Sequence, residues 1–318
     1  MVHPVISPDD VLQAGGLIAD RIRQTPVLEI SACELLGGDA EGTVSLKLEY
    51  LQHSGTFKAR GALHKLLVAE RDLASDRSVD SDRSVVAASG GNHGVAVAWA
   101  AQQLGWRATI FVPTIAAPAK IERLASYGAE VHRVGAVFSE ALAASEAFRA
   151  EHPSLSVHAY DDEVVAAGAG TVAVEWSEQT NSLDSIHVAC GGGGLSAGIV
   201  SFVGPNLPVV VCETTTTSSF ASALIAGRPV DVAVSGIAAD ALGATRLGSV
   251  AWNALTNAGS TSSVVTDDEV LAARHLMWEQ FRIWLEPAAA TAVAAFVAAP
   301  PLAGHHGILL CGANTSVQ

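Results

Sequence analysis

Charged residues and aromatic residues are both scarce in this sequence. Asp, Glu, Lys and Arg make up 16% of the 318 residues and Phe, Trp and Tyr make up 5%, whereas hydrophobic residues account for 49%. So little charge excludes a disordered chain and a coiled coil, because both carry far more. The apolar content is enough for a large buried core, and the length suits two lobes.

Positive charge is in especially short supply, and the formal net charge is −14. An acidic surface repels nucleic-acid phosphates and anionic lipids, so we expect no nucleic-acid partner and no membrane partner. The longest alanine-rich stretch, residues 288–299, is too short to span a bilayer. The first residues, MVHPVISPDD, lack the charged-then-apolar pattern of a signal sequence. These absences predict a soluble, cytoplasmic protein.

Cysteine is also rare, and the four cysteines stand at positions 33, 190, 212 and 311. No two of them have C-x-x-C spacing, which excludes the common zinc and thioredoxin-type motifs. Three of them lie in apolar runs. We therefore expect reduced thiols that are mostly buried, as in a cytosolic protein.

Short apolar runs alternate with helix-like segments along the chain. The runs are rich in β-branched residues and do not alternate with polar residues, which is typical of strands buried on both faces. The predicted strands are Val85–Ala88, Ala108–Val112, Ile186–Ala189, Val209–Cys212 and Ile308–Cys311. The predicted helices are Ala59–Leu73, Val95–Leu104, Ala119–Tyr127 and Leu195–Val203. This order predicts an α/β fold with largely parallel sheets, and the polar connector at residues 72–84 suggests a boundary between lobes.

The segment SGTFKARGA, residues 54–62, places Lys58 in the first turn of a predicted helix. A helix N-terminus favours negative charge, so a lysine there is electrostatically misplaced. Its pKa should be lowered, which suits an amine nucleophile or a Schiff-base former. A solvated surface lysine is the simpler interpretation of this segment taken alone.

Two further loops connect a strand to a helix. SGGNHG, residues 89–94, would hold Asn92 and His93 at the carboxyl end of a strand, although an asparagine helix cap fits the same pattern. CGGGGL, residues 190–195, predicts a phosphate-binding loop, because consecutive glycines let backbone N–H groups close around an anion. We see no packing use for four consecutive glycines.

The glycine loop also permits a dinucleotide-binding interpretation. Gly192, Gly194 and Ala197 fit the loose G-x-G-x-x-A fingerprint, and Glu213 ends the next predicted strand, where a ribose-binding carboxylate belongs. This would indicate an NAD-dependent oxidoreductase, but it gives the other loops no role. Finally, the predicted last strand ends at Cys311, which is either a site residue or a buried core thiol.

Together and in this order, these motifs resemble those of the fold-type-II pyridoxal-phosphate enzymes, specifically the serine/threonine dehydratase family, which includes serine racemase. The resemblance also covers residues 118–131 and 160–171 and extends from about residue 26 to residue 315. It implies the tryptophan synthase β-like α/β fold, in which two open, twisted, mostly parallel sheet domains flank a cleft. The implied large domain comprises residues 1–70 and 155–318 and binds the cofactor. The implied small mobile domain comprises residues 71–154, and the implied assembly is a homodimer.

The resemblance implies a role for each motif residue. Lys58 would hold pyridoxal 5'-phosphate as a Schiff base beside Phe57. Asn92 would hydrogen-bond the phenolic oxygen of the cofactor, and Cys311 would face its pyridine nitrogen. The cofactor phosphate would be bound by Gly191, Gly192, Gly193, Gly194 and Leu195. The substrate carboxylate would be bound by Ser89, Gly90, Asn92 and His93.

The implied reaction is the β-elimination of L-threonine or L-serine to a 2-oxo acid and ammonia. Another β-hydroxy amino acid, such as 3-hydroxyaspartate or a bulkier 3-hydroxy residue, is the alternative substrate, because Ala169 and Ala241 replace a glutamine and a glycine of the dehydratases. Gly90 stands where serine racemase has a second serine, which acts as the base on the opposite face of the substrate α-carbon. Since glycine has no side-chain proton to give, we expect little racemisation.

The racemase-like members also bind a divalent cation through an acid at the position of Glu213, a carbonyl at Thr217 and an acid at the position of Ser219. Here Ser219 is not acidic. One carboxylate and one carbonyl make a weak site for a hard cation. Glu213 is thus the sole carboxylate of this candidate metal site.

Overall fold

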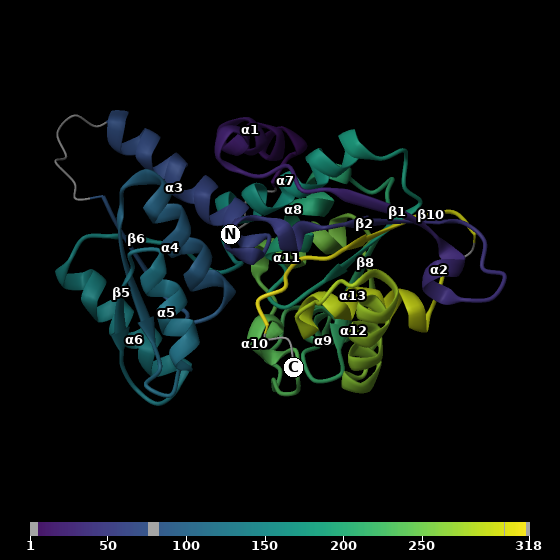
Figure 1. Ribbon diagram of the computed structural model, residues 1–318. Helices are drawn as coiled ribbons and strands as arrows, with labels where there is room; N and C mark the ends of the chain where they lie inside the picture. Colours follow the sequence, from purple (N-terminus) through teal and green to yellow (C-terminus); the bar gives the residue numbers. More distant parts are fainter. Residues whose placement is uncertain (1–5, 76–82, 302, 316–318) are drawn as a thin grey trace.

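The structure is a computed structural model that describes residues 6–75, 83–301 and 303–315 (Figure 1). Its strands are β1 (Val27–Ser31), β2 (Thr43–Lys47), β3 (Ser84–Ala88), β4 (Arg107–Val112), β5 (Glu130–Arg133), β6 (Leu155–Ser156), β7 (Ser185–Ala189), β8 (Val209–Thr214), β9 (Thr261–Val265) and β10 (His305–Leu309). They form a six-stranded sheet in the order β1-β2-β10-β7-β8-β9 and a four-stranded sheet in the order β5-β4-β3-β6. Among the described strand pairs, β1 with β2 alone is antiparallel.

The α-helices are α1 (Pro8–Ile18), α2 (Ala32–Leu36), α3 (Lys58–Ser75), α4 (Asn92–Leu104), α5 (Pro118–Ser126), α6 (Phe138–Glu151), α7 (Glu163–Gln179), α8 (Gly194–Val203), α9 (Ser219–Ala226), α10 (Ala239–Leu242), α11 (Ser249–Asn257), α12 (Asp267–Phe281) and α13 (Pro287–Ala298). Short 3₁₀ turns occur at Ala19–Arg21, Glu49–Leu51 and His53–Gly55. Within the described ranges, none of these helices has both the length and the apolar character needed to cross a bilayer.

The two sheets belong to two lobes, which lie side by side in Figure 1. The small lobe consists of the four-stranded sheet with α4, α5 and α6, and the large lobe consists of the six-stranded sheet with α1, α2 and α7 to α13. Helix α3 packs against both α4 and α7 and so connects them. The domain limits at residues 71–154 stay a prediction, and β6, which starts at residue 155, pairs with the small-lobe sheet. Most of the connector at residues 72–84 lies outside the described residues.

The predicted strands are present, with one shift. The last strand runs over His305–Leu309 rather than Ile308–Cys311. Its neighbour β2 ends at Lys47, and Leu310 makes the last ladder-like bond, from its N–H to the Lys47 carbonyl at 3.0 Å. The Cys311 carbonyl instead accepts a hydrogen bond from Phe57 N at 3.1 Å. The chain therefore passes from the sheet directly to the lysine segment.

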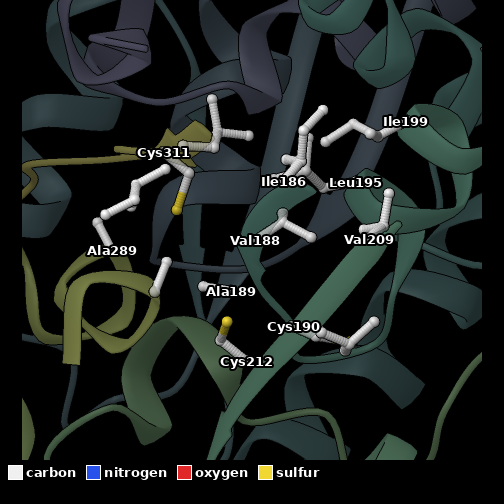
Figure 2. Packing of buried hydrophobic residues seen from close by; sticks show 14 of the residues in the cluster. Ile186, Val188, Ala189, Cys190, Leu195, Ile199, Val209, Cys212, Ala289 and Cys311 are labelled. Carbon is white, nitrogen blue, oxygen red and sulfur yellow. The ribbon is translucent and has the colours of Figure 1, made fainter. Parts of the chain in front are cut away.

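The core of the large lobe lies on both faces of its central strands. Every residue of β7 is buried, and Ile186 and Val188 pack in one cluster with residues of β8, α8 and α13 (Figure 2). Cys190, Cys212 and Cys311 belong to this cluster, which confirms the expected buried thiols, whereas Cys33 is exposed.

Helices α7 and α8 cross at a pair of glycines, Gly170 and Gly198. A Cβ at Gly198 would lie 2.1 Å from the Ala166 carbonyl oxygen and 2.6 Å from Gly170 N. Both are backbone atoms of a packed helix, so they have no room to move. The close approach of these helices therefore requires glycine.

We expect Gly198→Ala to destabilise the protein by about 1–3 kcal/mol or more, because the added methyl overpacks two helix backbones. Urea unfolding should show a lowered midpoint. The matched control is Gly16→Ala on the exposed face of α1, where a Cβ meets nothing within 4 Å. That change should leave stability unchanged or raise it by about 0.5–1 kcal/mol. Equal midpoints for the two variants would contradict the crossing argument.

Candidate active site

The predicted loops meet where the central strands end. The lysine segment joins the residues after β10 through an isolated bridge between Thr56 and Gly312. The loop after β3 reaches the same place, because Asn92 hydrogen-bonds Glu286, which lies just before α13. Parallel strands deliver such loops to one edge of a sheet, which is where α/β proteins bind ligands.

Lys58 begins α3 and is the reactive amine of this site. Its Nζ lies 3.3 Å from the Ala159 carbonyl oxygen and 5.0 Å from the centre of the Phe57 ring. No ion pair joins it to any of the described acidic side chains. Burial lowers the pKa of Lys58 to about 8, against the opposing influence of Cys311 and Glu286. The lowered pKa agrees with the sequence prediction, although its main cause is burial.

Cys311 is buried beside this lysine. Burial raises the pKa of its thiol, and the Glu286 carboxylate raises it further. The thiol is therefore neutral at physiological pH, so it is a weak hydrogen-bond donor and brings no charge to the site.

The glycine loop offers a set of unused backbone donors. In the part of the chain that the structure describes, none of the N–H groups of residues 191–195 donates a hydrogen bond to protein. Helix α8 begins at Gly194, and Gly193 has a φ of 88°. Free N–H groups at a helix N-terminus form an anion site, so the loop fits a phosphate group.

These glycines also have a packing use, which the sequence interpretation had denied. A Cβ at Gly192 would lie 2.2 Å from the ring of Tyr160, and a Cβ at Gly191 would lie 2.9 Å from the Leu242 backbone. Side chains at these positions would push away the walls of the site. The loop is thus glycine-rich for close approach as well as for anion binding.

The asparagine loop presents the N-terminus of α4. Gly91 N donates to Ser89 Oγ at 3.3 Å, and the His93 Nε2 atom lies 2.8 Å from the Val157 carbonyl oxygen. Burial, with Lys58 nearby, lowers the pKa of His93 to about 3, so its ring is neutral. The carboxylate-binding role of Ser89, Gly90, Asn92 and His93 stays a prediction. The N–H groups in the first turn of α4 are the donors suited to it.

Two residues that the sequence analysis did not single out complete the site. Glu286 Oε1 and Oε2 accept from Asn92 Nδ2 at 2.9 and 3.1 Å, and Asn314 Nδ2 donates to Asn92 Oδ1 at 2.7 Å. Burial raises the pKa of Glu286. The sequence signal was a lone carboxylate in the apolar run WLEPAAA, directly before a helix-starting proline.

Glu213 has hydrogen-bond partners within the protein itself. Its side chain is completely buried and accepts hydrogen bonds from Phe220 N at 2.7 Å and Ala221 N at 2.8 Å, which caps the start of α9. Burial raises its pKa to about 7. Among the described residues, no group of three or more His, Cys, Asp or Glu side chains could hold a metal ion. The cation site and the ribose contact at Glu213 stay predictions.

Two mostly parallel sheets whose strand ends meet at one site are the architecture of the fold-type-II pyridoxal-phosphate enzymes, and solved structures of that class superpose on nearly the whole chain. The chain matches the family model described as "Pyridoxal-phosphate dependent enzyme" over residues 18–312. It therefore belongs to the pyridoxal-phosphate dependent enzyme family, and its cofactor is pyridoxal 5'-phosphate.

Three relatives illustrate the range of this family. The chain is 35% identical to phenylserine dehydratase of Ralstonia pickettii, over 92% of this chain and 89% of the relative. It is 31% identical to an L-threonine ammonia-lyase of Geobacter sulfurreducens, over 86% of this chain and 68% of the relative. The structure of maize serine racemase superposes with a TM-score of 0.88 at 26% identity, covering 99% of this chain and 95% of that one.

The lowered pKa of Lys58 predicts how the amine reacts in the cofactor-free protein. Acetic anhydride modifies neutral amines, so acetylation of Lys58 should follow the neutral fraction and reach half its maximal rate near pH 8. Mass spectrometry of the Lys58 peptide measures this rate, and the Lys58→Ala variant identifies the labelled peptide by its loss. A rate that is still rising steeply at pH 10 would contradict the desolvation argument.

Proposed function

We propose that this protein catalyses the pyridoxal-phosphate-dependent β-elimination of a 3-hydroxy-L-amino acid, giving a 2-oxo acid and ammonia. L-Threonine and L-serine are the leading substrates, and a bulkier or acidic 3-hydroxy amino acid is the alternative. The observation that carries the proposal is Lys58, whose unpaired amine has a pKa of about 8. Such an amine can form the Schiff base and also take a proton near neutral pH.

The residues of the site divide the work of this reaction. Bound pyridoxal phosphate supplies an electron-withdrawing ring that delocalises charge from the substrate α-carbon. The free N–H groups of residues 191–195 would hold the phosphate of the cofactor, and Asn92 would contact its phenolic oxygen. Lys58 Nζ takes the α-proton, and the Ala159 carbonyl, at 3.3 Å, orients that nitrogen. The N–H groups at the start of α4 would hold the substrate carboxylate.

The neutral thiol of Cys311 supports elimination over competing reactions. A carboxylate beside the pyridine nitrogen would keep that nitrogen protonated, whereas a thiol is too weak a donor to do so. A ring whose nitrogen is not protonated would withdraw less charge from the substrate, which would favour prompt loss of the β-hydroxyl, as water, over slower competing reactions. The L-threonine ammonia-lyase at 31% identity supports this reaction class.

Phenylserine is the specific alternative substrate. The relative with phenylserine dehydratase activity is 35% identical to this chain, a higher identity than that of the ammonia-lyase. Ala241 lies on α10, next to Asp240, whose carbonyl oxygen would be 3.7 Å from a Cβ at Gly91. The replacement of a glycine by Ala241 therefore falls on an element that borders the substrate loop.

The visible absorption spectrum of the purified protein, followed during substrate addition, tests the proposal. We expect a yellow band that changes with L-threonine, L-serine or 3-phenylserine, and formation of the matching 2-oxo acid. Comparing kcat/KM among these three and 3-hydroxyaspartate ranks the substrates. The Lys58→Ala variant should form no 2-oxo acid. If the protein takes up the cofactor but eliminates water from none of the four, the proposed reaction is wrong.

Gly90 predicts the balance between elimination and racemisation. Gly90 has no side chain that could protonate the opposite face of the substrate α-carbon. D-Serine should therefore form much more slowly than pyruvate from L-serine. A Cβ at Gly90 would lie 3.3 Å from Val112 Cγ1, close enough to fit after a small shift. We therefore expect Gly90→Ser to raise the ratio of D-serine to pyruvate, and Gly90→Ala to leave it unchanged. Chiral chromatography measures this ratio, and a D-serine yield equal to pyruvate in the unaltered protein would refute the argument.

A further inference from the structure

Asn92, Glu286 and Asn314 form a hydrogen-bonded cluster that crosses from one lobe to the other. Asn92 belongs to α4 of the small lobe, whereas Glu286 precedes α13 and Asn314 follows β10, both in the large lobe. Asn314 N donates to Glu286 Oε2 at 3.1 Å, and Asn314 Nδ2 donates to the Ser54 carbonyl at 2.9 Å. With the two contacts of Asn92, these bonds close a ring of donors and acceptors, which we call the amide clamp.

The amide clamp permits one orientation of the Asn92 side chain. Asn314 Nδ2 has carbonyl oxygens as both of its partners, Asn92 Oδ1 at 2.7 Å and Ser54 O at 2.9 Å. A flipped Asn92 would face the Asn314 amide with its own NH₂ group and face the Glu286 carboxylate with its oxygen. Donor would then meet donor and acceptor would meet acceptor. Asn314 thus fixes the oxygen of Asn92, and Glu286 fixes its nitrogen.

This orientation leaves one N–H of Asn92 unused. Asn92 Nδ2 lies 2.9 and 3.1 Å from the two oxygens of the same Glu286 carboxylate, so a single N–H directed between these oxygens can serve both. The second hydrogen on Asn92 Nδ2 points elsewhere, and it has no acceptor among the described residues. A half-buried amide N–H without a partner suits an acceptor oxygen of a bound group.

Two glycines leave space for the amide clamp, and one strained residue supplies a carbonyl acceptor to it. A Cβ at Gly312 would lie 2.4 Å from Glu286 Oε1, and a Cβ at Gly55 would lie 2.4 Å from Asn314 Oδ1. Ser54, whose carbonyl accepts from Asn314, is buried and has a left-handed φ of 60°. Its carbonyl also accepts from Arg123 Nη2 of the small lobe at 3.0 Å. Backbone strain of this kind is retained where the surrounding structure requires it.

We propose that Glu286 and Asn314 are positioning residues, which hold the Asn92 amide across the lobe boundary with its second N–H turned toward the cofactor. This inference rests on the proposed function only in that Asn92 is the residue that would contact the phenolic oxygen. The clamp makes that contact depend on the lobes being together. Glu286 and Asn314 therefore determine how strongly Asn92 of the small lobe binds the cofactor.

The experiment is a double-mutant cycle on the dissociation constant of pyridoxal phosphate, measured by equilibrium dialysis of the apoprotein. Asn314→Asp replaces the donor to Asn92 Oδ1 with an oxygen, so it should weaken cofactor binding by about ten- to a hundredfold. In the Asn92→Ala background the same change should alter the constant by less than about twofold, because no amide is left to orient. A merely structural role for Asn314 would give the same loss in both backgrounds, and this result would overturn the proposal.

Glu286→Gln provides a second test that does not depend on how well Asn314→Asp folds. A glutamine has one acceptor where the carboxylate has two, so its NH₂ group must face either Asn92 Nδ2 or Asn314 N. Cofactor binding should weaken by about tenfold, again only when Asn92 is intact. Asn181→Asp and Glu178→Gln, on the exposed surface, make the same chemical changes and should bind the cofactor normally. Unaltered binding by Glu286→Gln would contradict the proposal.

These measurements separate the inference from the proposed reaction. Cofactor affinity requires no turnover, so coupling between Asn314 and Asn92 would support the amide clamp even if no 3-hydroxy amino acid were eliminated. Elimination of L-threonine, together with additive effects of the two substitutions, would support the reaction and overturn the clamp.

Discussion

The removal of the Lys58 amine from water, without a carboxylate to pair with it, is the constraint on which this site depends. Arg60, the next cation along α3, is by contrast paired with two carboxylates. Arg60 Nε lies 2.6 Å from Glu49 Oε1, and Arg60 Nη2 lies 2.8 Å from Glu175 Oε2, with Lys47 paired to the same Glu175. This buried network fixes the first turn of α3 to β2 and α7. Lys58 is therefore held in place without an ion pair of its own, and burial lowers its pKa.

The parallel sheet explains why one rigid lysine meets all the other groups. Residues 89–94, 190–195 and 310–315 each follow the carboxyl end of a strand, so the sheets collect these loops along facing edges. Two of the loops lead directly into helices, and their free N–H groups favour anions. A molecule with a phosphate at one end and a carboxylate near the other matches such a pair of helix N-termini. In the proposed reaction, Lys58 would set the position of the reacting carbon.

Sequence patterns predicted the segments of the site whose conformation is determined by neighbouring residues in the chain. Strand, glycine turn and helix follow from neighbouring residues, so Lys58 and both loops could be found in the sequence. Glu286 and Asn314 could not be paired in the same way, because they are 28 positions apart and meet Asn92 through tertiary packing. The register of the last strand, which leaves Cys311 outside it, depends on where its partner β2 ends. No pattern local to residues 305–311 contains that information.

Glu213 shows that one local pattern is compatible with several roles. A carboxylate at the end of a strand beside a glycine loop can bind a ribose or a cation, but it can also cap the next helix. The Glu213 carboxylate accepts two backbone N–H groups of α9 and is completely buried. A buried charge needs partners, and here the nearest unsatisfied donors belong to the protein itself. Sequence spacing cannot tell which donors will be nearest.

The side-chain hydrogen bonds of Asn92 all cross from the small lobe to the large lobe, so all of them depend on the two lobes staying in contact. Asn92 belongs to the small-lobe helix that follows β3, whereas Glu286, Asn314 and the glycine loop belong to the large lobe. The donor–acceptor distance of a hydrogen bond can vary by only a few tenths of an ångström, so a small separation of the lobes would remove all the contacts of Asn92 together. Lys58 is different, because its helix α3 packs against both lobes. The ion pairs of Arg60 hold the first turn of α3 within the large lobe, so the position of Lys58 depends less on the contact between the lobes than the position of the Asn92 amide does.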